Sequence, residues 1–180
     1  MTTIVDGTTG ITFPSAIAGV SATQQYSGRV LQVVQTVKTD TFTTSSGSFT
    51  DVTGLTVSIT PTSSSSKILV LYDVGLSCQN GTGAPIRMLR GSTVIYAGDA
   101  AGSRPLGLAQ MDGASSQYSI YRVSGTFLDY PATTSSITYK FQILNSASGT
   151  SAVNRTQQDR DSSTYDTRSA SSITVMEIAA

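Results

Sequence analysis

Residues 136–144 read SITYKFQIL, a stretch in which apolar and polar side chains alternate without a break. In an extended chain, every second side chain points to the same face. One face of this stretch is therefore apolar, and it is made by Ile137, Tyr139, Phe141 and Ile143. A period of two predicts a β-strand with one face in a core and the other in water. Residues 55–60, LTVSIT, repeat the pattern.

The other apolar runs of the chain are also typical of strands. Residues 67–76, KILVLYDVGL, are apolar on both faces at first, which predicts a central strand covered on both sides. Further strands are expected from β-branched or alternating segments at residues 30–37, 86–88, 93–97, 118–130 and 171–180. Gly125 indicates a bulge or a close backbone approach.

About eight strands and no sustained helical period predict an all-β fold. Parallel strands need crossover connections that are usually helical, so these strands are expected to be largely antiparallel. The sequence therefore predicts an antiparallel β-sandwich, or a barrel of the jelly-roll kind.

The composition excludes several kinds of function. The 180 residues include 11 basic and 11 acidic side chains, no histidine and one cysteine, Cys78. A neutral chain offers no overall field for nucleic acid or anionic lipid, and no apolar run is long enough to cross a membrane. A disulfide within the chain, a paired-cysteine zinc site and imidazole catalysis are all excluded. We expect no catalytic residue, cofactor or metal, and a buried structural thiol at Cys78.

The first 28 residues differ from the rest of the chain. Residues 1–20 read MTTIVDGTTGITFPSAIAGV and show neither a basic start followed by an apolar run nor a periodic face. We expect no secretory signal. Residues 1–28 are predicted to form an extended docking arm whose apolar anchors are Ile11, Phe13 and Ile17, and residues 29–180 to form the sandwich. The alternative is a frayed tail.

Two polar segments resemble functional motifs only in part. Residues 64–67, SSSK, match the S-x-x-K pattern of penicillin-recognising enzymes, but they form a turn before a strand, and the partner motifs are missing. Residues 157–166 contain Asp159, Asp161 and Asp166, which indicate either a calcium loop or a solvated loop neutralised by neighbouring arginines. The glycine and glutamate that an EF-hand needs are absent, which favours the solvated loop.

Eight tyrosines and no tryptophan raise the question of sugar binding, because tyrosine combines a flat apolar face with a hydroxyl tip. Tyr121 and Tyr139 share faces with core-like residues and are expected in the core or in a subunit interface. Tyr96, Tyr130 and Tyr165 lie near strand ends or in loops. These three are the candidate ligand-facing residues.

Several blocks of residues 28–180 occur in an order that resembles a family of tailed-bacteriophage virion proteins, often labelled tail-fibre or structural proteins. The blocks include GRVLQVVQTVKTDTFTTSSGSFTDVTGLTVSITPTSSSSKILVLYDVGL, RMLRGSTVIYAGDAAGSR, FLDYPATTSSITYKFQI and SSITVMEIAA. The segment VDGTTGITFPS near the start also resembles segments found near the ends of phage fibre proteins. The resemblance implies a jelly-roll-like domain that works as a symmetric oligomer, a trimer, and brings no catalytic residues.

The leading hypothesis is a non-enzymatic protein of the virion surface, made in the cytoplasm of the bacterial host. Its partners are expected to be its own copies and other virion proteins of the capsid or tail. The short arm favours a capsid decoration protein or a short fibre tip over a long fibre. The expected oligomer interface is the last strand, through Ile173, Val175, Met176 and Ile178. The alternative is a receptor-binding module for a host surface glycan, contacted by the loop tyrosines and residues 98–116.

Overall fold

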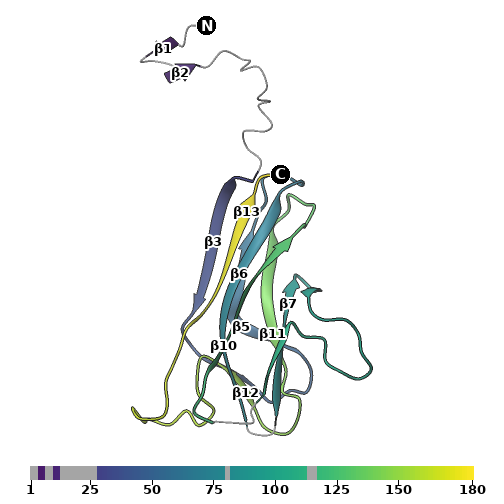
Figure 1. The fold of residues 1–180 in the computed structure, drawn as a ribbon, viewed down its shortest axis with the longest axis vertical. Coiled ribbons are helices and arrows are strands. Elements are labelled where there is room, and N and C mark those ends of the chain that lie inside the picture. The colour runs from purple at the N-terminus through teal and green to yellow at the C-terminus, as the bar shows by residue number, and fades with distance from the viewer. Residues whose placement is uncertain (1–3, 7–9, 13–27, 80–81, 113–116) are drawn as a thin grey trace.

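The molecule is a sandwich of two antiparallel β-sheets (Figure 1). The structure is a computed structural model and describes residues 4–6, 10–12, 28–79, 82–112 and 117–180. Every regular element in these ranges is a strand. The fold class predicted from the alternating segments is therefore confirmed.

Within the described residues, the first sheet has six strands and the second has five. The first sheet runs in the order β3 (Val30–Lys38), β13 (Ser171–Ile178), β6 (Lys67–Cys78) and β10 (Tyr121–Asp129), and it is extended by β4 (Phe42–Thr44) and β12 (Ser151–Val153). The second sheet runs in the order β5 (Thr50–Ile59), β11 (Ile137–Ile143) and β7 (Gly83–Arg90), and β7 pairs in turn with β8 (Thr93–Tyr96) and β9 (Ala109–Asp112). A separate hairpin joins β1 (Ile4–Asp6) to β2 (Gly10–Thr12).

The strand pairs are nested along the chain. β3 pairs with β13, β5 with β11, β6 with β10, and β7 with β8 and β9. The chain from β3 to β13 is thus one long antiparallel hairpin rolled into two sheets, which is the topology of a jelly roll. Of the two possibilities that the sequence left open, the antiparallel sandwich is the one that is present, and its strand order is jelly-roll-like.

The core lies between the sheets and follows the alternation of the strands. Every second side chain of β6 is buried, from Ile68 to Leu76, and β11 contributes Tyr139, Phe141 and Ile143, all with no exposed surface. Burying side chains of this size stabilises the fold by about 1.5–3 kcal/mol each, before conformational entropy is counted. The predicted core face of residues 136–144 is confirmed.

Gly125 lies where β10 passes the ring of Tyr72. A Cβ atom on Gly125 would be 2.7 Å from the Tyr72 hydroxyl oxygen and 3.1 Å from Cζ. Gly125 is the direct strand partner of Tyr72. The Tyr72 ring contacts the ring of Phe141 in the opposite sheet, with ring centroids 5.3 Å apart. The close backbone approach predicted for Gly125 is confirmed.

Candidate interaction surface

The outer face of the β3–β13–β6–β10 sheet bears a row of apolar side chains across all four strands. Val33 pairs with Met176, Met176 with Leu69, and Leu69 with Leu128. Direct partners in antiparallel strands point to the same face. Leu69 points outward because its neighbours Ile68 and Val70 are fully buried. We call Val33, Met176, Leu69 and Leu128 the apolar row.

Solvent reaches much of this surface. Val33 is 55% exposed and Leu128 is 37% exposed, while Met176 and Leu69 are half-buried. Ile178, one pleat further along β13, is also half-buried and faces a bulge in β3 where Val30 and Leu31 are both exposed. The prediction that residues 67–76 form a central strand is confirmed, but the outward side chains of that strand are only half covered within one chain.

The outer face of the second sheet has a different character. Thr138 and Ser58 share a hydrogen bond of 2.7 Å between their hydroxyl groups, and Lys140 forms an ion pair of 2.7 Å with Asp51. The pKa of Asp51 is lowered chiefly by its hydrogen bond with Lys140. One outer face therefore presents polar and charged groups to water, and the other presents an apolar row.

β3 is also an edge strand. Among the described strands it pairs only with β13, so its other side leaves backbone groups free to pair. Edge strands are usually protected by charged side chains or proline. β3 has no proline, and its one charged residue, Lys38, is 2% exposed, with Nζ lying 2.8 Å from the Asp40 carboxylate. An edge strand of nine residues whose one charged side chain is buried, next to the apolar row, is a surface suited to another chain.

The root of the N-terminal arm, Gly28, lies beside the C-terminal end of β13. The Gly28 N–H donates to the Ala179 carbonyl, and the Ala179 N–H donates to the Arg29 carbonyl, both at 2.9 Å. The C-terminus therefore lies beside the start of β3 (Figure 1). Of the three predicted anchors, Ile11 lies in β2, paired with Val5, whereas Phe13 and Ile17 fall outside the described residues.

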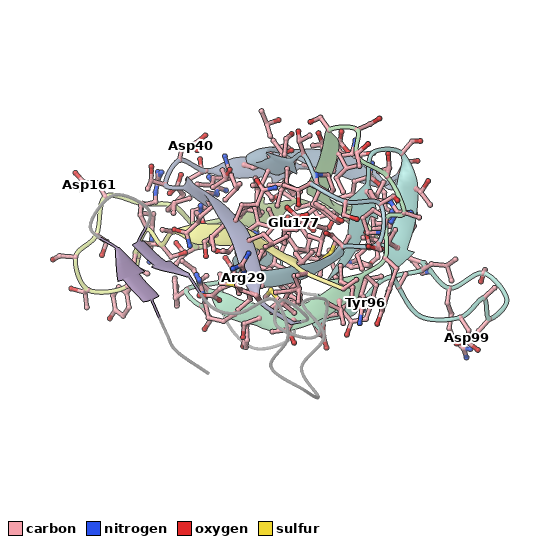
Figure 2. The ribbon with its side chains drawn as sticks, turned by 90° about the horizontal axis from the view of Figure 1, so that it is seen from above. Arg29, Asp40, Tyr96, Asp99, Asp161 and Glu177 are labelled. Atoms are coloured by element: carbon pink, nitrogen blue, oxygen red, sulfur yellow. The ribbon has the colours of Figure 1, made fainter. Side chains whose placement is uncertain are left out.

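A buried carboxylate fixes this end of the sandwich. Glu177 of β13 has no exposed surface and lies within the body of the molecule (Figure 2). It accepts hydrogen bonds from the Thr62 N–H and hydroxyl, both at 2.7 Å, and from Gln32 Nε2 at 2.6 Å. Burial works to raise its pKa, but these hydrogen bonds outweigh burial and lower the pKa to about 2. The network joins β3, β13 and the turn after β5.

A second polar cluster closes the core between the sheets. Asp129, 7% exposed, accepts hydrogen bonds from Arg90 at 2.7 Å and from the Tyr139 hydroxyl, also at 2.7 Å. Burial, followed by the bond to Asp129, raises the pKa of Tyr139 well above its usual range. The cluster connects β7 and β11 of one sheet to β10 of the other.

The four residues predicted for the oligomer interface point in two directions. Ile173 and Val175 have no exposed surface and belong to the core, because they occupy the inward positions of β13. Met176 and Ile178 occupy outward positions and adjoin the exposed side chains of β3. Only Met176 and Ile178 are placed where a second molecule could contact them.

The three candidate ligand-facing tyrosines do not come together. Tyr96 is half-buried and stacks on Phe127 with ring centroids 4.8 Å apart. Tyr130, 62% exposed, follows β10 near the first residues of β6. Tyr165, 58% exposed, lies in the loop after β12, which pairs with the last residues of β6. The length of β6 thus separates Tyr130 from Tyr165.

Tyr165 does have an aromatic neighbour. Its ring lies 5.4 Å from that of Tyr118, which is 46% exposed, and the Arg160 guanidinium lies 4.8 Å from the centroid of the Tyr118 ring. The pairing with Tyr118 could not be found from the sequence, because 46 residues lie between Tyr118 and Tyr165 in the chain.

The acidic loop is neutralised by arginines, as the sequence predicted for a solvated loop. Asp159 forms ion pairs with Arg155 and Arg168, both at 2.7 Å, and Asp166 forms one with Arg160 at 2.9 Å. The loop projects from the body, with Asp161 on it (Figure 2). Across the described ranges, no group of three acidic, histidine or cysteine side chains could hold a metal ion.

The buried structural thiol that the sequence predicts at Cys78 is confirmed, and Asn154 is a second buried polar residue. Cys78 is buried, and burial raises the pKa of its thiol. Asn154 belongs to a glycosylation sequon, but it has no exposed surface and a φ of 64°, and its amide donates to the carbonyls of Lys38 and Asp40 at 2.8 and 3.0 Å. The Asn154 N–H also donates to the Gly75 carbonyl, and Asn154 Oδ1 accepts from the Ser171 hydroxyl. Asn154 is therefore a structural turn residue that connects the end of β12 to β3, β6 and β13.

No family model and no curated protein matches the chain. Among solved structures, the chain is similar to one titled "Structure of infectious bursal disease virus Gt strain", with 13% sequence identity and a TM-score of 0.41. The match covers 93% of this chain and 50% of the other, so the chain spans half the length of that neighbour. A likeness of this degree bears on neither family nor function. Within the described ranges, no helix is long and apolar enough to cross a lipid bilayer.

Proposed function

We propose that this chain is a non-enzymatic structural protein on the surface of a tailed-bacteriophage virion, either a capsid decoration protein or a short fibre tip. In this proposal the sandwich, residues 29–180, associates with its own copies as a homotrimer. The arm, residues 1–28, attaches the assembly to other virion proteins of the capsid or tail. The protein is made in the cytoplasm of the bacterial host.

The apolar row is the observation that supports this proposal most. A rigid sandwich with one polar outer face and one partly apolar outer face is suited to association rather than to turnover of a substrate. The resemblance of residues 28–180 to virion structural proteins supports the assignment to a tailed-bacteriophage virion. The proposal of a trimer rests on that resemblance alone.

The arm supports attachment to a scaffold. Its hairpin of β1 and β2 has only three residues in each strand. Isolated two-stranded hairpins are marginally stable in water, so one this short needs a partner surface. The root at Gly28 is hydrogen-bonded to Ala179, directly after β13, so the arm is connected to the sheet at two strands, β3 and β13.

Truncation tests the role of the arm. A variant that lacks residues 1–27 keeps Gly28 and its bond to Ala179, and is expected to fold and self-associate. It is mixed with particles assembled without the protein, beside the full chain, and bound protein is measured after sedimentation. We expect the truncated protein to stay in the supernatant and the full chain to sediment. Full occupancy by the truncated protein contradicts arm-mediated attachment.

A receptor-binding module for a host surface glycan is the second candidate. The exposed pair of Tyr118 and Tyr165 favours it, because neighbouring aromatic faces suit the apolar faces of sugars. A glycan array separates the candidates. Reproducible binding that is lost in Tyr165→Ala and kept in Tyr96→Ala, whose ring packs on the core, supports recognition. No binding to the array supports decoration.

A further inference from the structure

We infer that copies of this chain join through the outer face of the β3–β13–β6–β10 sheet, with the apolar row at the centre of the contact and the β3 edge at its border. The inference rests on the self-association proposed above and names the surface and the occupant, which is a second copy of the same chain. Four observations lead to it.

The first observation is the alignment of the apolar row. Val33, Met176, Leu69 and Leu128 come from four strands and lie at one level of the sheet, because strand register places them opposite one another. The row ends on both sides in side chains that are more than a third exposed. Apolar side chains scattered over a surface need no explanation, but a continuous row across a whole sheet marks a contact surface.

The second observation is the chemistry of the next row. Gln35 pairs with Thr174, Thr174 with Leu71, and Leu71 with Thr126. Amide and hydroxyl groups both donate and accept hydrogen bonds. They can therefore pair with the same groups of another copy, which a carboxylate or an ammonium group cannot do. Whichever parts of this face meet in a closed assembly of identical chains, such groups can pair with each other, so this chemistry favours identical chains over a charged partner.

The third observation is charge. Asp73 and Arg122, which border the two rows, form an ion pair with each other through Arg122 Nη2 and the Asp73 carboxylate. The chain as a whole has 11 basic and 11 acidic residues. The face also bears Lys67, opposite Ile178, and its Nζ lies 5.5 Å from the centroid of the Tyr130 ring. The whole molecule has no net charge that would keep two copies apart.

The fourth observation is the position of the arm root. Gly28 and Ala179 lie beside Val30 and Ile178, at the border of the same surface. In a cyclic trimer whose axis runs along the strands, copies that meet through this face have their arm roots at one end of the assembly. The arms can then reach one scaffold together, and several weak contacts add to a stable attachment.

Single charge substitutions in the apolar row, compared with one on the opposite face, test the inference. Val33→Glu and Leu128→Glu place carboxylates at two exposed positions of the apolar row, where folding should tolerate them. Val94→Glu is the matched control, because Val94 is 36% exposed on the outer face of the second sheet. Sedimentation velocity over a concentration series gives the dissociation constant of each protein. Circular dichroism, together with the failure of the buried Cys78 thiol to react with a thiol reagent, confirms that each variant is folded.

We expect the wild type and Val94→Glu to associate equally, and each row variant to raise the dissociation constant at least tenfold. Row variants that associate like the wild type overturn the inference and leave self-association standing. A wild type that stays monomeric overturns both. Equal weakening by Val94→Glu also overturns the inference.

A disulfide test does not depend on weakening the contact. The native Cys78 is buried, so only cysteines introduced at positions 33 and 128 are accessible for disulfide formation between copies. Oxidation of Val33→Cys/Leu128→Cys is expected to give covalent oligomers at protein concentrations where the control Thr56→Cys/Val94→Cys stays monomeric on a denaturing gel. Equal crosslinking of the two proteins overturns the inference.

Discussion

Replacing Glu177 with glutamine should remove a large part of the acid sensitivity of this fold. The pKa of Glu177 is lowered from 4.5 to about 2 in the folded chain. A lowered pKa means that the carboxylate contributes stability above pH 4.5 and loses it as pH falls through 2. The full contribution is about 3 kcal/mol, of which about 2 kcal/mol is lost by pH 3. Glutamine cannot titrate, so this loss should be missing from Glu177→Gln.

Urea unfolding at a series of pH values from 7 to 2 measures the effect. The quantity compared is the change in unfolding free energy between pH 5 and pH 2, since other carboxylates with lowered pKa values, such as Asp51, contribute equally to both proteins. Thr62→Val keeps the carboxylate but removes one of its donors, so the pKa of Glu177 should rise toward 4.5, and the loss of stability should be smaller and complete at a higher pH. If Glu177→Gln loses as much stability as the wild type over this range, the hydrogen-bonded carboxylate is not the source.

Three further outcomes follow from the packing. Gly125→Ala should destabilise the fold by about 1–3 kcal/mol in thermal unfolding, since its Cβ would contact the Tyr72 hydroxyl, and Tyr72→Phe should recover part of that loss. Asn154→Asp should cost about 3 kcal/mol or more, because it places an acceptor against two carbonyls, and a urea midpoint equal to the wild type would contradict this. Cys78 should react with a thiol reagent only after unfolding, so rapid labelling of the native protein would show that the thiol is not buried.

The alternating segments were sufficient to predict the core. Tyr139 and Phe141 were placed on an inward face by a period of two, and both are fully buried. The central strand at residues 67–76 was predicted by a different signal, the apolar character of both of its faces. Periodicity works here because one face of each strand meets the opposite sheet, so burial repeats every second residue.

The short strands were not predicted. β4, β9 and β12 have three or four residues each and lie in segments rich in hydroxyl groups or small residues. Their backbone hydrogen bonds to neighbouring strands hold them extended, and such bonds leave no pattern in the side chains. Glu177 was missed for a related reason, because its inward position is tolerable only through donors supplied by Gln32 and Thr62 from distant parts of the chain.

The apolar row depends on strand register, which the sequence does not specify. Val33, Leu69, Leu128 and Met176 are far apart in the chain, and only the pairing of four strands places them at one level. The sequence did contain one signal, the apolar character of both faces of residues 67–76. The same ambiguity led to the prediction of an interface at Ile173 and Val175, since a period of two separates the two faces of β13 but does not say which one is inward.

The mass of the purified full chain in solution tests the central claim most directly. One chain has a mass of 18.7 kDa. Light scattering across a concentration series should give a discrete multiple of this mass, three chains if the trimer proposal holds, and the multiple should fall to one when Val33 and Leu128 are both replaced with glutamate. A wild-type mass of a single chain at every concentration would contradict the account.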